Sequence, residues 1–135
     1  MTDGGMEYLE LDDVLELGRR LLGDPVPVRD MGLLGSAVAR PRTTVFGQDA
    51  YPDVWTKAAA PLQSIVNNHA LIDGNKRLGW LATAVFLELN GASVCHAHND
   101  DVYDFVIDIA ANNIELELIA ECLRQLGSSG TPSGR

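Results

Sequence analysis

Apolar residues recur at intervals of three or four positions along most of the chain, which is the spacing of one face of an α-helix. The clearest run extends from Leu11 to Leu22, where Gly23 followed by two prolines stops the helix. Five more helices are expected: from Asp30 to before Pro41, from Asp53 to about His69, from about Asn75 to Asn90, from Asn99 through Ile109, and from Ile114 to Leu126. The pattern therefore predicts an all-α fold with six helices.

Two stretches depart from the helical pattern. Residues 42–47 are rich in β-branched and aromatic side chains and favour a short exposed flap or hairpin. Residues 127–135 consist of Gly, Ser, Thr, Pro and Arg, and are expected to form a disordered tail. Residues 1–126 then form a single domain, because a chain of 135 residues is long enough to bury one hydrophobic core.

The third expected helix contains a proline, Pro61, at an interior position. Proline removes a backbone donor and collides with the preceding turn, so it kinks or breaks a helix at a cost of about 3 kcal/mol. Either the helix bends at Pro61, or a new helix begins there, since proline is tolerated in a first turn. We expect the bend.

The formal net charge of −9 limits the partners of the chain. Direct binding to nucleic acid requires a basic face and is not expected. The longest apolar run is too short to span a bilayer and is interrupted by Glu88, and no signal peptide opens the chain. Cys95 and Cys122 lack the spacing of a metal site and are expected to be free thiols. These features favour a cytoplasmic protein without a membrane partner.

Residues 69–77 carry the strongest chemical signal in the chain. Histidine is the residue type whose ordinary pKa lies closest to neutral pH, so His69 is suited to accept a proton from an attacking hydroxyl. Asp73 offers a hard oxygen ligand for Mg²⁺. The apolar run that follows predicts a buried helix, which places this segment at the start of that helix.

The start of a helix attracts anions because its first N–H groups have no partner within the helix. Gly74 and Asn75 lie at such a start, and Lys76 and Arg77 add two positive charges. A base, a metal ligand and an anion site together describe the transfer of a phosphoryl or nucleotidyl group. The same residues also fit an ordinary turn between two helices, but their ordered set on an acidic chain favours a functional site.

The string HALIDGNKR resembles the signature of the Fic/Doc family, His-x-Phe-x-(Asp/Glu)-Gly-Asn-(Gly/Lys)-Arg. Lys76 stands where Fic enzymes carry a second glycine, which resembles the Doc branch of small bacterial toxins from toxin–antitoxin pairs. Residues 29–41 resemble the RD-GLLESALARP stretch of Doc-like proteins. The resemblance extends from about Met6 to Leu126, and it departs from the pattern at Leu71, in place of Phe, and at Gly35, in place of Glu.

The resemblance implies a compact six-helix Fic/Doc-type domain that binds ATP and Mg²⁺ at the motif. It makes His69 the catalytic base and Asp73 a catalytic residue that holds the metal. The residues it assigns to nucleotide and phosphate binding are Gly74, Asn75, Lys76 and Arg77. Those in the position of the family's substrate-binding flap are Thr43, Thr44, Val45 and Phe46.

Two roles are open to the expected flap. Its exposed, extended edge can pair with a segment of the target by strand addition, which would present the target hydroxyl to His69. Alternatively, a β-branched strand at this position merely covers the core.

Fic members of the family transfer AMP to a hydroxyl, whereas the Doc branch places the γ-phosphate of ATP on a threonine of elongation factor Tu and arrests translation. Lys76 fills part of the anion site with a side chain and a charge, which alters how the triphosphate lies. Trp80 replaces the second arginine that nucleotidyl-transferring members carry. Both features favour a Doc-like kinase. The alternatives are AMP transfer to a protein hydroxyl and a non-catalytic module that only binds a partner.

The sequence contains no self-inhibitory motif of the kind found in many Fic proteins, a Ser or Thr followed four residues later by Glu and then Gly or Asn. An active enzyme without this motif requires an external inhibitor, and the resemblance implies a separately encoded, Phd-like antitoxin. We expect a segment of this partner to fold on contact and to cover an apolar groove near the site.

Overall fold

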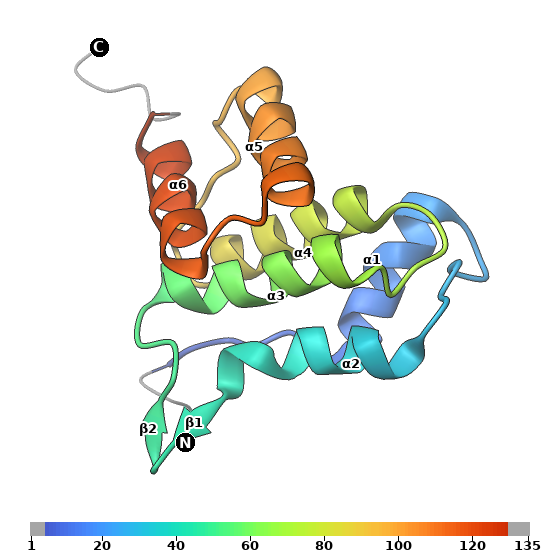
Figure 1. Cartoon of the computed structure of the whole chain (residues 1–135), viewed down its shortest axis with the longest axis horizontal. Helices are drawn as coiled ribbons and strands as arrows, with labels where there is room; N and C mark the ends of the chain where they lie inside the picture. The colour runs from blue at the N-terminus through green and yellow to red at the C-terminus, as the bar shows by residue number, and fades with distance from the viewer. Residues whose placement is uncertain (1–4, 130–135) are drawn as a thin grey trace.

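Six α-helices and one short hairpin make up residues 5–129, the part of the chain that the computed structural model describes (Figure 1). In chain order the elements are α1 (Leu11–Leu22), α2 (Met31–Ala39), a 3-10 turn (Arg40–Arg42), β1 (Thr44–Val45), β2 (Gln48–Asp49), α3 (Val54–Asn68), α4 (Asn75–Leu89), α5 (Asn99–Asn112) and α6 (Leu116–Ser129). The prediction of a mostly helical domain with six helices is confirmed.

Helix α3 lies at the centre of the fold and packs along α4 (Figure 1). Helices α5 and α6 lie on one side of α3 and α2 lies on the other, while α1 contacts α4 and α2. The two central helices approach closely at Gly79, where an added Cβ atom would come within 3.1 Å of Val66. Trp55 and Trp80 are partly buried against the core between α3, α4, α5 and α6, as expected of residues that anchor it.

The starts of two helices differ in how they are capped. The Asp30 carboxylate accepts a hydrogen bond from the Leu33 N–H at 3.0 Å, which makes Asp30 the N-cap of α2. Helix α5 begins at Asn99, and its N-cap is His98. The His98 side chain makes no capping hydrogen bond, so α5 lacks the side-chain cap of α2.

Helix α6 corrects the predicted end of the domain. A disordered tail was expected from Gly127, yet the helix continues to Ser129. Gly127 lies close to the Trp55 ring, because an added Cβ atom there would come within 3.1 Å of it. The helix therefore includes this glycine despite its low helix propensity. The rest of the expected tail, residues 130–135, lies outside the described residues.

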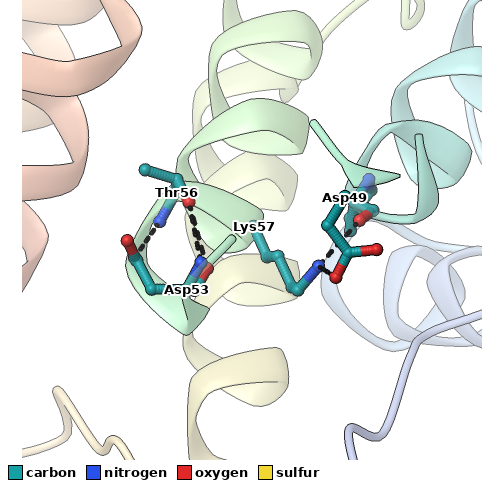
Figure 2. A network of polar contacts seen from close by, with 5 residues as sticks. Asp49, Asp53, Thr56 and Lys57 are labelled. Carbon is teal, nitrogen blue, oxygen red and sulfur yellow. Dashed lines mark hydrogen bonds and ion pairs between the residues drawn. The ribbon is translucent and has the colours of Figure 1, made fainter. Parts of the chain in front are cut away.

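Helix α3 is continuous through Pro61, so the alternative of a new helix beginning there is wrong (Figure 1). The true start is a capping box at Asp53 (Figure 2). The Asp53 carboxylate accepts from the Thr56 N–H at 2.9 Å, and the Thr56 hydroxyl accepts from the Asp53 N–H at 3.3 Å. This reciprocal pair satisfies donors that the first turn leaves without partners.

Cys95 and Cys122 are free thiols, as predicted. Between residues 5 and 129, no helix combines the length and the apolar character that crossing a bilayer requires.

Candidate active site

The loop that joins α3 to α4 holds the residues of the HALIDGNKR motif. His69 ends α3 with a left-handed backbone, φ 54° and ψ 51°, and its side chain is exposed. Gly74 precedes α4 with φ 91°, a conformation that glycine adopts without strain. An added Cβ atom at Gly74 would also lie 2.7 Å from a methyl group of Leu22, so the Leu22 side chain would have to move to admit a larger residue. These two positions reverse the chain within a few residues.

Asn75 fastens the loop from inside. Its side chain is buried, and its Oδ1 accepts from the Leu71 N–H at 2.9 Å while its Nδ2 donates to the Leu71 carbonyl at 3.0 Å. Asn75 was predicted to bind phosphate, but its side-chain amide is engaged by the backbone. Only its main-chain N–H, at the start of α4, is placed to meet an anion. Leu71 itself is 1% exposed, so the residue that departs from the motif's Phe is part of the core.

Arg29 holds the other side of the loop, a role that the sequence does not reveal. Its Nε donates to the His69 carbonyl at 2.8 Å, and its Nη2 donates to the carbonyls of His69 and Asn68 at 2.5 and 3.2 Å. The backbone N–H groups of Arg29 and Asp30 both donate to the Ala70 carbonyl. Forty residues separate Arg29 from His69, so only the tertiary fold brings them together. The Arg-Asp pair before α2 is the one visible signal, since it belongs to the stretch that resembles Doc-like proteins.

Replacing Arg29 by lysine is expected to reduce the rate of the group transfer that the motif predicts by about tenfold. The reason is that a single ammonium group cannot form the two-pronged contact by which the guanidinium fixes the His69 carbonyl. Thermal unfolding should change little, since the freed carbonyls can bond to water at the surface. Arg19→Lys, at another exposed arginine, is the matched control and should retain full turnover. Equal turnover in the Arg29 variant and the wild type would show that the fork does not position His69.

Charged side chains surround the start of α4. Lys76 and Arg77 lie in its first turn, and both are exposed. The Arg77 guanidinium lies 3.8 Å from the Asp73 carboxylate, with 59% and 84% of these side chains exposed. An ion pair this long and this exposed contributes little energy. Both groups are therefore available to a ligand at low cost.

The residues of the loop fit a magnesium–nucleotide complex better than a free metal ion. Asp73 provides one carboxylate, and residues 5–129 contain no group of three or more His, Cys, Asp or Glu side chains placed to hold a metal. Mg²⁺ is commonly held by one or two carboxylates together with substrate phosphates and water. Asp73 beside a phosphate-binding helix start matches this arrangement.

The predicted flap is a two-stranded antiparallel hairpin, in which Thr44 pairs with Asp49 and Val45 with Gln48. Thr43 to Phe46 are all exposed, so the alternative that this segment covers the core is wrong. The hairpin, however, lies at the opposite end of α3 from His69 (Figure 1). It is attached at Lys57, and the twelve residues from there to His69 span about 18 Å of helix. The structure does not bring the flap to the loop that carries His69.

A groove of about 420 Å³ begins beside the loop and runs between α4 and α5. Lys76 and Arg77 border it, and Trp80 and Tyr103 line it with other, mostly aliphatic side chains. Trp80 also packs edge-on against Phe105, with ring centroids 6.3 Å apart. The groove is an apolar surface with two cations at one end.

The six helices, the hairpin and the loop that joins the two central helices together define a class of proteins. The chain belongs to the Fic/DOC family, whose model matches residues 8–87, a range that includes the hairpin and the whole loop. It is 48% identical to Toxin Doc of Mycolicibacterium smegmatis (strain ATCC 700084 / mc(2)155), over 115 residues that cover 84% of this chain and 88% of that relative. Members of the family are generally transferases.

Proposed function

We propose that the protein is a Doc-like toxin kinase, which transfers the γ-phosphate of ATP to a threonine or serine hydroxyl of a translation factor, namely elongation factor Tu. The observation that carries the proposal is the loop 69–77, where a histidine and a cationic helix start are held together by Arg29 and Asn75. The name of the mycobacterial relative, Toxin Doc, supports the assignment to a toxin. Action on a translation factor would take place in the cytoplasm.

Each residue of the loop has a separate task in this reaction. His69 accepts the proton of the attacking hydroxyl, whose oxygen forms the new bond to the γ-phosphorus as the bond to ADP breaks. Lys76, Arg77 and the first amides of α4 bind the phosphate oxygens, where negative charge must be held. Asp73 would hold Mg²⁺, which supplies further positive charge to the phosphates.

Two residues favour transfer of the γ-phosphate over transfer of AMP. Lys76 adds a side chain and a full charge at the position of a glycine in nucleotidyl-transferring members, which narrows the anion site. Trp80 lies in the groove next to Arg77. Its neutral side chain cannot form an ion pair with the remaining phosphates of the nucleotide. Both features change how the triphosphate lies against His69.

The antitoxin is the second proposed partner. The α4–α5 groove is open, mostly apolar and bordered by Lys76 and Arg77, which suits an amphipathic segment with acidic residues at one end. A Phd-like antitoxin segment bound there would lie next to the phosphate site and exclude ATP. Supplying a neighbouring small open reading frame in the same cell should therefore relieve growth arrest, and persistent arrest would count against this inhibitor.

Labelled ATP distinguishes the two transfer reactions. Purified elongation factor Tu is incubated with the protein and with ATP labelled either at the γ- or at the α-phosphate. We expect label on the factor only from the γ position. Label from the α position would instead assign the protein to the nucleotidyltransferases, and label from neither would favour a module that only binds its partner.

A further inference from the structure

The loop between α3 and α4 carries a large apolar side chain on its surface. Ile72 lies between the buried Leu71 and the exposed Asp73, and it is 72% exposed. Among the large hydrophobic residues between positions 5 and 129, only Phe46 is more exposed. A single exposed apolar residue is common on a protein surface. This one, however, belongs to the same short loop as the proposed base and the proposed metal ligand.

Hydrogen bonds fix the backbone of Ile72. Its N–H donates to the Pro27 carbonyl at 2.8 Å, and the preceding residue, Leu71, pairs with Val28 in an antiparallel bridge. Successive side chains of such paired backbone point to opposite faces. Because Leu71 is buried in the core, Ile72 projects outward. Isoleucine is branched at Cβ and has few rotamers, so this side chain is ordered before it meets a ligand.

A second exposed apolar residue lies at the start of α2, beside the same loop. Met31 is the first residue of α2 and is 47% exposed. The N–H groups of the two residues before it both donate to the Ala70 carbonyl, at 2.7 and 2.9 Å. Since the paired segments run antiparallel, Met31 lies toward the His69 end of the loop and Ile72 toward its other end.

The positive charges of the site lie further along the chain, at the start of α4. Lys76, Arg77 and the first amides of that helix are proposed to bind the phosphates. Charged phosphate oxygens lose hydration against an aliphatic side chain and gain no partner there. Ile72 and Met31 therefore suit the other reactant, which brings its hydroxyl to His69.

The residues next to the acceptor hydroxyl have to lie over this part of the loop. A general base acts only within hydrogen-bond reach of the proton that it removes, so the hydroxyl lies against His69. One residue of an extended chain covers about 3.5 Å. The neighbour of the acceptor residue thus cannot reach the hairpin, which is attached about 18 Å of helix away. It remains beside the loop and the start of α2.

We propose that Ile72 is a specificity-determining residue for the acceptor. Together with Met31, it selects a threonine or serine that has an apolar residue next to it in the chain of the target protein. A charged neighbour would lose its hydration against these two side chains without gaining a partner, which weakens its binding. The inference rests on the proposed transfer function and adds the class of acceptor segment to it.

Ile72→Thr beside Ile72→Val tests the proposal, because the two new residues share their branching and differ in polarity. With elongation factor Tu and γ-labelled ATP, we expect the threonine variant to raise the KM for the factor about tenfold. The valine variant should stay within about threefold of the wild type. In both variants, kcat and the KM for ATP should change less than about twofold, whereas a disturbed loop would lower kcat.

Met31→Gln beside Met31→Leu repeats the comparison on α2. We expect the glutamine variant to raise the same KM about threefold and the leucine variant to leave it unchanged, because Met31 is the less exposed of the two contacts. Leu118→Thr, at a half-exposed apolar position on α6, is the matched control and should change neither KM.

The acceptor supplies an independent test. Mass spectrometry of the modified factor locates the phosphorylated residue, and at least one of its two neighbours in the chain should be apolar. Aspartate in place of that neighbour should raise the KM about tenfold with the wild-type toxin and less than about threefold with Ile72→Thr, since the lost contact is shared. Polar neighbours on both sides, or equal effects in the two backgrounds, would overturn the proposal.

The outcomes separate this role from the kinase function. If the wild type transfers phosphate and Ile72→Thr has an unchanged KM, the specificity role is overturned and the kinase stands. An unchanged KM together with weaker inhibition by the antitoxin would assign Ile72 to the antitoxin, which also overturns the role. If only the α-phosphate label is transferred, the kinase fails and the same variants decide the role of Ile72 in AMP transfer. If neither label is transferred, both proposals fail together.

Discussion

Alanine in place of His69 is expected to lower phosphate transfer to elongation factor Tu by about a hundredfold to ten-thousandfold, the range for loss of a general base. The side chain is exposed and ends α3, so its removal leaves the core intact. ATP binding should persist, because the imidazole is assigned to the acceptor proton and not to the phosphates. The measurement is the initial rate of γ-phosphate transfer, with nucleotide affinity determined separately.

Two further variants make this result specific. Alanine is strained at φ 54°, whereas asparagine tolerates the left-handed region, so His69→Asn removes the base and keeps the backbone. It should be as inactive as His69→Ala. His96→Ala, at an exposed histidine outside the loop, should be fully active. Substantial transfer by His69→Asn would contradict the assignment of His69 as the base.

Glycine in place of Lys76 is expected to reduce transfer by about tenfold to a hundredfold, the effect of losing one hydrogen bond to a charged group. The substitution also recreates the loop of nucleotidyl-transferring members of the family. If Lys76 sets the orientation of the triphosphate, the residual activity should include a measurable share of AMP transfer. The products are separated by mass after reaction with elongation factor Tu.

The glycine itself costs helix stability, about 1 kcal/mol, and this effect needs its own control. Arg20→Gly removes a cation and places glycine at an exposed position in the last turn of α1, with no contact to the site. It should unfold at a lower temperature and transfer phosphate normally. Lys76→Arg, which keeps the charge, should retain most activity. Unchanged phosphorylation by Lys76→Gly would show that this lysine does not orient the nucleotide.

The helices and the loop between α3 and α4 could be predicted from the sequence because their signals are local. The apolar spacing of α1, the Gly23 that ends it and the Asp30 that begins α2 all act within a few residues of the element that they define. The motif 69–77 is local as well, and it is read directly from residue chemistry. Local patterns also placed a hairpin correctly near residue 46.

The contacts that give the loop its shape could not be predicted in the same way. Arg29 reaches the His69 carbonyl across forty residues, and the one signal near Arg29 in the sequence is its place in the stretch that resembles Doc-like proteins. Asn75 looked like a phosphate ligand because it follows Gly74, yet its amide closes the loop onto Leu71. Gly127 predicts the end of a helix, but α6 continues to Ser129, and Gly127 lies close to the Trp55 ring.

The position of the hairpin is the largest difference from expectation. Its sequence suits an exposed strand edge, and its family resemblance suggested a place beside His69. Helix α3 is 15 residues long and separates the two. The helical pattern predicted this helix, so the expected place beside His69 came from the resemblance alone. The buried Lys57, which a charge pattern would assign to the surface, fixes the hairpin at the far end.

The intact mass of elongation factor Tu, purified after induced expression of the wild-type protein or of His69→Ala in a bacterial host, tests the central claim most directly. The kinase account predicts a gain of roughly 80 Da, the mass of one phosphoryl group, with the wild type and none with the variant. A gain of one AMP group with the wild type, or growth arrest by both proteins without any change in mass, would contradict it.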